Sequence, residues 1–237
     1  MVQEIRHYQP KIGGKKLYRL LQDELGRMNS PAGRDKFFDI LRNAGLLVKK
    51  KKKYVRTTDS YHHFRKYKNK LKDRLLKGPN EAWVSDITYL RTQRDGFVYL
   101  FLQTDAYSRK ITGWDVSESL GIEGAVNALK MSLRQNPGCT GIIHHSDRGI
   151  QYCCKKYVGL MKKHKMEISM TEENHCYENA IAERVNGILK QEFLLDEKFE
   201  NKAIAIKAVR EAIESYNNRR PHWSLNLCTP QEIHHAA

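Results

Sequence analysis

The spacing of hydrophobic residues changes about one third of the way along the chain. Before residue 80, apolar residues recur at helical intervals in two segments, "KKLYRLLQDEL" (15–25) and "GRDKFFDILRNAGLL" (33–47). Gly45 stands where the C-terminal cap of the second segment belongs. The head of the chain is therefore predicted to hold two short helices joined by a turn, an arrangement similar to a helix-turn-helix.

Beyond "KGPNEAW" (77–83) the period becomes that of β-strands. "WVSDITYL" (83–90) alternates between apolar and polar residues, and "GFVYLFLQTD" (96–105) is almost continuously apolar. The elements expected after these two strands are a strand at 110–117, a helix at 121–135, a strand at 140–147, a helix at 151–165 and a strand at 166–170. This order predicts an α/β fold, with a mixed sheet flanked by helices and preceded by a small basic helical domain.

Charge is distributed unevenly over the 237 residues. Residues 1–80 hold 22 Lys and Arg against 7 Asp and Glu, whereas residues 81–237 hold 20 of each, so the whole net charge of +15 lies in the first third. A neutral body with a basic head indicates a polyanionic partner. "KKKKKYVR" (49–56) fits a solvated linker, but the location of the charge favours an arm that contacts nucleic-acid phosphates.

Other features narrow the class of protein. The chain lacks an apolar run of about 18 residues, and its start, "MVQEIRHYQPKIGG", lacks the apolar core of a secretion signal. We therefore expect no membrane association and a cytoplasmic location. The five cysteines are odd in number and contain no C-x-x-C pair. A disulfide framework or a zinc finger is therefore not expected.

Three acidic residues stand out from this scaffold. Asp86 lies in mid-strand on the face of Val84 and Thr88, against the propensity of aspartate, and such conflicts concentrate at functional sites. Asp147 ends a buried strand in "IIHHSDRGIQY" (142–152), where a turn or helix cap would also explain it.

The third acid, Glu183, belongs to a predicted helix in "YENAIAERVNGILKQEF" (177–193). Apolar residues form one stripe of that helix, and the opposite face carries Asn179, Glu183, Asn186 and Lys190. A solvated helix face explains this pattern equally well. Three carboxylates on rigid elements of a protein with a basic head nevertheless suit two Mg²⁺ ions that assist the displacement of a phosphate ester.

The motifs "WVSDITYL", "IIHHSDRGIQY" and "YENAIAERVNGILK" resemble the catalytic signature of DDE transposases and retroviral-type integrases. The spacing of the three acids, above all the interval of 35 between Asp147 and Glu183, resembles the orfB-type subunit of two-reading-frame bacterial insertion sequences. The head segments and "YNNRRPHWSLNLCTP" (216–230) extend the resemblance over nearly the whole chain.

The resemblance implies an RNase H-like fold in which Asp86, Asp147 and Glu183 form the catalytic, metal-binding triad. It implies Mg²⁺ as cofactor, in two ions, with Mn²⁺ as a substitute. The residues expected to contact DNA are Lys190, Asn179, Lys49, Lys50, Lys51, Lys52, Lys53, Arg56, Arg219 and Arg220. For Arg219 and Arg220, closure of a helix end is an equally good explanation. His144 and His145 are expected to support the site rather than bind metal.

The expected organisation is a helix-turn-helix-like DNA-binding segment at 1–58, a basic linker at 59–80 and an integrase catalytic core with a helical extension at 81–237. The expected function is Mg²⁺-dependent cleavage of element ends and strand transfer into target DNA, near the bacterial nucleoid. Expected partners are double-stranded DNA, further copies of the chain and an upstream-frame helix-turn-helix product, joined as a frameshift fusion. The alternatives are a decayed copy that acts as a repressor and an RNase H-like nuclease.

Overall fold

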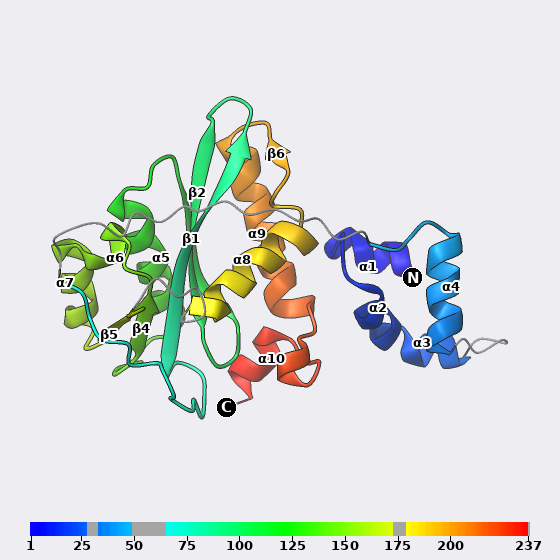
Figure 1. The fold of residues 1–237 in the computed structure, drawn as a ribbon, viewed down its shortest axis with the longest axis horizontal. Coiled ribbons are helices and arrows are strands. Elements are labelled where there is room, and N and C mark those ends of the chain that lie inside the picture. The colour runs from blue at the N-terminus through cyan, green and yellow to red at the C-terminus, as the bar shows by residue number, and fades with distance from the viewer. Residues whose placement is uncertain (28–32, 49–64, 173–178, 237) are drawn as a thin grey trace.

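The computed structural model describes residues 1–27, 33–48, 65–172 and 179–236. A lobe of short helices lies beside a larger body built on one mixed sheet (Figure 1). The α/β class, with a helical segment that precedes the sheet along the chain, is as predicted.

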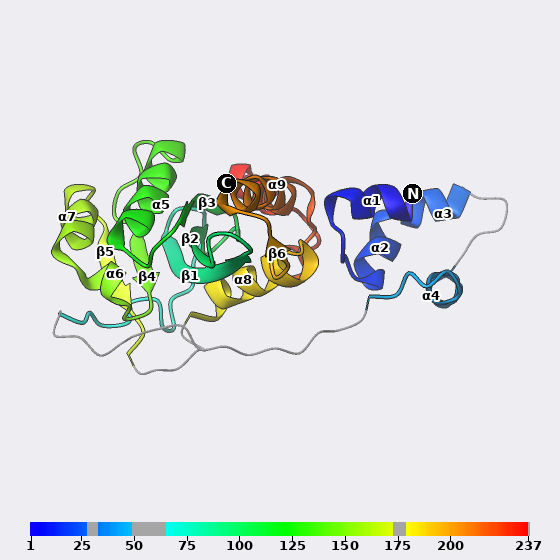
Figure 2. The ribbon, with the colours of Figure 1, turned by 90° about the horizontal axis from the view of Figure 1, so that it is seen from above.

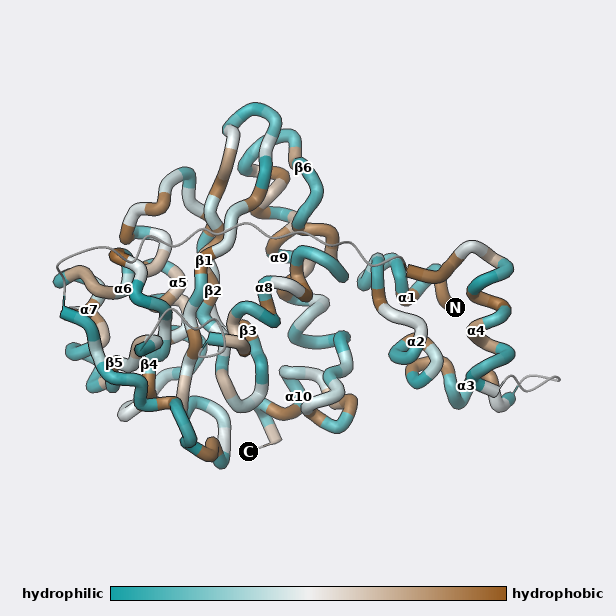
Figure 3. The backbone as a smooth tube through the Cα atoms, viewed as in Figure 1, coloured by the Kyte–Doolittle hydropathy of each residue, from teal (hydrophilic) through white to brown (hydrophobic). Residues whose placement is uncertain are grey.

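The helical lobe holds more helices than the two expected. They are α1 (Val2–Tyr8), α2 (Gly14–Leu20), α3 (Gln22–Arg27) and α4 (Arg34–Asn43). The predicted helix at 15–25 divides at Leu21, and α1 was not anticipated. Apolar and polar residues alternate around α4 (Figure 3), and its buried side packs on Leu17, Leu21 and Leu25. Gly45 adopts a φ of 66°, so it closes α4 as predicted.

The sheet contains every strand that the pattern predicted. The strands are β1 (Ala82–Thr92), β2 (Phe97–Asp105), β3 (Ile111–Ser117), β4 (Ile143–Ser146) and β5 (Glu167–Met170). Their order is β3-β2-β1-β4-β5. β2 pairs antiparallel with both β1 and β3, whereas β4 pairs parallel with both β1 and β5. The short β6 (Lys198–Phe199) pairs with the far end of β1, where β4 no longer reaches.

Helices cover both faces of the sheet (Figure 2). One layer consists of α5 (Ile122–Gln135), α6 (Ile150–Cys153) and α7 (Lys155–Lys163), and the other of α8 (Ala180–Glu192) and α9 (Lys202–Arg219). The predicted helix at 151–165 is two helices, because Cys154 is extended and caps α7 by accepting the Tyr157 N–H at its Sγ. The chain ends in a 3₁₀ turn (Trp223–Leu225) and α10 (Pro230–His235).

Each face of the sheet has its own apolar core, because successive strand residues point to opposite sides. Trp83 of β1 and Phe101 of β2 pack among α5, α6 and α7. Leu90 and Leu102 pack against α8 and α9 instead. Asp86 has the same parity as Leu90 and is the register partner of Leu102, so it faces α8. Of the helices in the described parts of the chain, none combines the length and apolar character needed to cross a membrane.

Candidate active site

Asp86 and Asp147 lie side by side on adjacent parallel strands. The register pairs Val84 with His145, so two residues further on Asp86 stands level with Asp147, which follows the last residue of β4. Both aspartates therefore emerge on the α8 face, on strands about 4.8 Å apart. The two acids are far apart in the sequence, and the parallel pairing brings them together.

The surroundings of Asp86 disfavour its negative charge. Its Oδ1 accepts the Ile87 N–H at 2.9 Å and its Oδ2 accepts the Asn186 side-chain N–H at 2.7 Å. Burial nevertheless raises the pKa of Asp86 to about 7, and the charge of Asp147 and, more weakly, that of Glu183 raise it too. Burial is the main cause of this shift, and the two neighbouring carboxylates add to it.

Glu183 approaches the pair from α8. It lies in the first turn of the helix, is exposed to solvent and acts electrostatically on Asp86; partial burial raises its own pKa. Among the residues that the structure describes, no three His, Cys, Asp or Glu side chains are close enough to enclose one ion. The pair Asp86 and Asp147 is thus assembled, and Glu183 stands near it without completing a closed set of ligands.

The residues present fit a hard divalent cation. All three acids offer carboxylate oxygens, the ligands that Mg²⁺ prefers. Burial and, after it, the mutual repulsion of the acids raise the pKa of Asp86, and a bound cation would offset both effects. Two buried amide oxygens on this side of α8, Oδ1 of Asn179 and Oδ1 of Asn186, have no hydrogen-bond partner among the described residues. Both would accept hydrogen bonds from water molecules around an ion.

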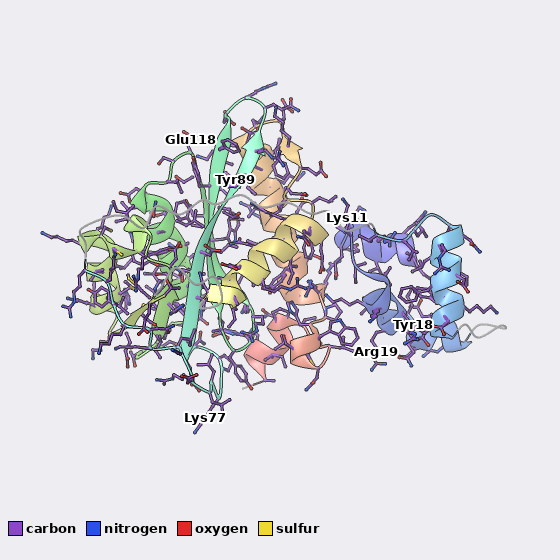
Figure 4. The ribbon with its side chains drawn as sticks, in the orientation of Figure 1. Lys11, Tyr18, Arg19, Lys77, Tyr89 and Glu118 are labelled. Carbon is purple, nitrogen blue, oxygen red and sulfur yellow. The ribbon has the colours of Figure 1, made fainter. Side chains whose placement is uncertain are left out.

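Lys190 lies within electrostatic reach of the acids, as its position on the polar face of α8 suggested. Burial lowers the pKa of Lys190, and the charge of Asp86 opposes that shift. Its Nζ stands 4.1 Å from the ring centroid of Tyr89, a β1 residue labelled in Figure 4. The Asn179 side chain is buried and donates to the Ser85 carbonyl at 3.1 Å, so it fastens the start of α8 to β1.

Asn186 is the contact that the sequence did not reveal. The helical pattern placed it on the face of Glu183 and Lys190, but an asparagine there reads equally well as a surface residue. In the structure it is 7% exposed and holds Asp86 directly. A short polar residue in mid-helix, one turn after a candidate acid, was the available signal.

His144 is buried and supports β1 from the other side of the sheet. Its Nε2 lies 2.7 Å from the Ser85 hydroxyl and 2.8 Å from the Tyr157 hydroxyl. Burial and the neighbouring His145 lower its pKa to about 3, so the ring is neutral. His145 contacts the Ser169 hydroxyl through Nδ1 at 2.8 Å. These contacts join β1, β4, β5 and α7.

The other residues expected to contact DNA either lie outside the described residues or contact side chains of the protein. Lys49, Lys50, Lys51, Lys52, Lys53 and Arg56 lie outside the described residues. The Arg219 guanidinium stacks on Tyr8 at 3.9 Å. Arg220 is 2% exposed and forms a two-pronged ion pair with Glu192, at 2.7 and 2.8 Å. This internal pairing holds the buried Arg220 side chain against the end of α8.

Comparison with protein families agrees with this architecture. A model described as "Integrase core domain" matches residues 77–176, and a second model with the same description matches residues 164–230. Together the two matches span all the strands, α8 and α9.

Several curated relatives cover most of the chain. An uncharacterized 31 kDa protein of insertion element IS600 from Shigella sonnei is 36% identical over 214 residues, which are 90% of this chain and 78% of the relative. The transposase InsF for insertion sequence IS3A from Escherichia coli (strain K12) is 34% identical over 215 residues, 90% of this chain and 74% of the relative.

Solved structures share the fold at low sequence identity. The catalytic core domain of HTLV-2 integrase, in complex with magnesium, superposes with a TM-score of 0.52 at 18% identity, over 67% of this chain and 98% of that one. A chain of the simian T-cell lymphotropic virus intasome, in complex with PP2A regulatory subunit B56 gamma, gives a TM-score of 0.59 at 16% identity. That match covers 95% of this chain and 75% of the other. These likenesses confirm the RNase H-like fold.

Proposed function

The chain belongs to the integrase-core family of insertion-sequence transposases, and from this premise we propose that it cuts DNA at the ends of its element and joins the freed 3′-hydroxyl to target DNA. The reaction is an in-line displacement at phosphorus that depends on Mg²⁺. The observation that carries the proposal is the placement of Asp86 and Asp147 on adjacent strands, with Glu183 across from them on α8.

Asp86, Asp147 and Glu183 would hold the cations. Two bound Mg²⁺ ions would supply the charge that neutralises the phosphate and stabilises the attacking and leaving oxygens. The magnesium in the HTLV-2 integrase core supports the choice of metal. Asp86 and Asp147 start from rigid strands, which gives a metal site its precision.

Neighbouring side chains would orient these ligands and the DNA. Asn186 holds one Asp86 oxygen and so fixes the orientation of that carboxylate. Asn179 holds the start of α8 on β1, and Glu183 lies in the first turn of that helix. Lys190, close to Asp86, is placed to contact a phosphate on the strand that enters the site.

The basic head would bind the flanks of the same DNA. We propose the organisation expected above, with residues 1–58 as a DNA-binding segment, 59–80 as a basic linker and 81–237 as the catalytic core. Cleavage at two ends of an element requires more than one active site, so the working assembly would be an oligomer. An upstream-frame product that supplies further DNA-binding surface would be its partner, acting on DNA in the bacterial cytoplasm.

The test is strand transfer by the variants Asp86→Asn, Asp147→Asn and Glu183→Gln. A labelled end duplex and a plasmid target in Mg²⁺ would report cleavage and joining separately, and an electrophoretic mobility shift in EDTA would report binding. We expect each variant to lose both chemical steps and to keep DNA binding, with Asp73→Asn, an exposed linker acid, as matched control.

The same assay separates the competing functions. Cleavage without joining in the wild-type chain would show a nuclease, and binding without either step would show a repressor. Activity that survives all three acid substitutions would reject the metal site.

A further inference from the structure

A second hollow lies on the side of α8 opposite the candidate active site. Its volume is about 360 Å³, within the range of small-ligand sites. Ile181, Arg184 and Ile188 line it, whereas Asn186, about half a helical turn away from Arg184, contacts Asp86. The remaining walls come from α2, the turn between β2 and β3, the end of α9 and the segment that follows α9.

The pocket collects positive charge that is only partly balanced. Its cationic lining consists of Lys16, Arg109, Arg184 and Arg220. Glu192 pairs with Arg220 and stands 3.8 Å from the Lys16 Nζ, and the buried Asp105 acts on Arg109 from behind the lining. Burial, followed by the charge of Arg220, lowers the pKa of Lys16 to about 8. Four cations set against two acids leave an excess of positive charge, an arrangement suited to an anionic ligand.

Buried polar groups of the pocket point to a ligand as well. His222 is 7% exposed, and its Nε2 has no hydrogen-bond partner among the described residues. Its ring packs edge-on against Tyr216, which also lines the pocket. Unsatisfied buried nitrogens are costly, so a native structure that keeps one in a basic pocket indicates a missing partner.

Trp223 adds an aromatic surface at the rim. It is 59% exposed, in contrast to Trp83, which is fully buried. The pocket floor is apolar, formed by Ile181, Val185 and Ile188. A free phosphate would use neither feature. A nucleotide, with a charged phosphate and a flat base, would use both the cations and the aromatic surface.

The pocket shares a wall with a smaller hollow at the start of α8. Ala180 and Ile181 line both this pocket and a smaller hollow of about 310 Å³, which Asn179 and Val84 also line. The helix α8 lies between the pocket, lined by Arg184, and Asp86, which Asn186 contacts. An α-helix is about 10 Å across, which corresponds to roughly three nucleotides along a strand.

We propose that this pocket binds one unpaired nucleotide of the DNA substrate, near the scissile phosphate, with its phosphate on Lys16 and Arg184 and its base stacked on Trp223. The inference rests on the proposed function, because it assumes that DNA reaches the acids beside α8. It assigns to the protein a preference for DNA whose end is opened or frayed.

The test measures binding without chemistry. The full chain carrying Asp86→Asn, in EDTA, would be titrated against a labelled blunt duplex and against the same duplex with a short single-stranded overhang. We expect the overhang to bind about tenfold more tightly, since stacking of a base on an aromatic side chain has that effect. Trp223→Ala should abolish this preference and Trp223→Phe should restore most of it.

Charge and fluorescence provide independent readouts. Arg184→Gln should weaken overhang binding and lower the slope of log affinity against log salt by about one, since one phosphate contact is lost. Arg134→Gln, an exposed cation on α5 across the sheet, is the matched control and should leave the preference intact. Overhang DNA should quench part of the tryptophan emission, and that part should vanish in Trp223→Ala.

The outcomes separate the pocket from the proposed function. If the wild-type chain joins DNA in Mg²⁺ but Trp223→Ala keeps the full overhang preference, or if no preference exists, the pocket assignment is wrong and the transposase proposal stands. If the wild-type chain neither joins nor binds DNA, both fail together. Because Trp223 and Arg184 are exposed, circular dichroism should show native folding in both variants.

Discussion

At the scale of single residues, the carboxyl group of Asp86 lies in surroundings that disfavour its ionised form. Burial and the neighbouring Asp147 raise its pKa from 3.8 to about 7. The folded protein therefore holds a proton that the unfolded chain has released, and stability falls as the pH rises through that interval. A carboxylate that we propose as a metal ligand thus lowers the stability of the metal-free protein.

Removing the Asp86 charge should stabilise the metal-free protein. We expect Asp86→Asn to increase the free energy of unfolding at about pH 8 by up to about 4 kcal/mol, at about 1.4 kcal/mol per pKa unit. The gain should shrink below pH 7 and disappear near pH 4. Thermal unfolding in EDTA across this pH range would measure it, and Asp73→Asn should give no such trend.

Asn186 should act through Asp86 rather than on DNA. Asn186→Ala removes the donor to Asp86 Oδ2, so the carboxylate loses both its orientation and a stabilising hydrogen bond. We expect a roughly 10- to 100-fold rise in the Mg²⁺ concentration needed for half-maximal strand transfer, the usual effect of losing a partner of a metal ligand. Excess Mg²⁺ should restore much of the rate. A loss of rate that no Mg²⁺ concentration restores would contradict this role.

At the scale of secondary-structure elements, α5 packs so closely on the sheet at two glycines that a Cβ does not fit there. A Cβ built on Gly113 of β3 would lie 2.1 Å from the Ala128 carbonyl oxygen, and one on Gly124 of α5 would lie 2.3 Å from the Phe101 ring. Helix and sheet therefore approach each other most closely at these two glycines. The strand edge and α5 must separate before any larger residue fits.

Gly113→Ala should consequently be strongly destabilising. We expect a loss of about 1–3 kcal/mol or more, typical of an overpacked core. Gly159→Ala in α7 is the control, because a Cβ there meets nothing within 4 Å, and alanine should stabilise that helix by up to about 1 kcal/mol. The urea concentration at the unfolding midpoint should fall for Gly113→Ala and rise for Gly159→Ala. Similar shifts for both variants would show that α5 can adjust its position.

At the scale of the whole molecule, Glu192 joins three parts of the chain. It ends α8, pairs with Arg220 after α9, and approaches Lys16 of the helical lobe. Its backbone carbonyl also accepts the Lys11 N–H at 3.0 Å, where Figure 4 labels Lys11 beside the sheet body. Burial alone would raise the pKa of Glu192, but the hydrogen bond and charge of Arg220 outweigh burial and lower it.

Breaking this junction should destabilise the protein. Glu192→Gln leaves Arg220 buried without a counter-charge, which costs about 3–5 kcal/mol. Since the pKa of Glu192 is depressed, its contribution is complete above the ordinary glutamate value and is lost as the pH falls through the folded-state value. Glu123→Gln breaks the exposed pair with Lys156 and should cost less than about 1 kcal/mol. Equal unfolding midpoints for the two variants would overturn the assignment.

Much of this molecule could be predicted from local sequence patterns. The strands from 83 to 170, α5, the cap at Gly45 and the excess charge of the head depend on neighbouring residues, so alternation, helical spacing and turn chemistry reveal them. Of the three acids, Asp86 stood out because it conflicts with the propensity of its own strand, whereas Asp147 at a strand end and Glu183 on a polar helix face also fit ordinary structural roles. The helix breaks at Leu21 and Cys154 were not predicted, because short helices depend on tertiary packing that a helical pattern of apolar residues does not record.

Tertiary structure decided which of these residues meet. Parallel pairing of β1 with β4 sets Asp147 beside Asp86, the crossing of α8 over the sheet brings Asn186 to the same carboxylate, and the turn after α9 carries Arg220 to Glu192. The contact between Asn186 and Asp86 joins residues 100 positions apart, and that between Arg220 and Glu192 joins residues 28 positions apart. Side-chain spacing within one segment reports only its own faces, whereas a contact across segments is set by the way whole elements pack.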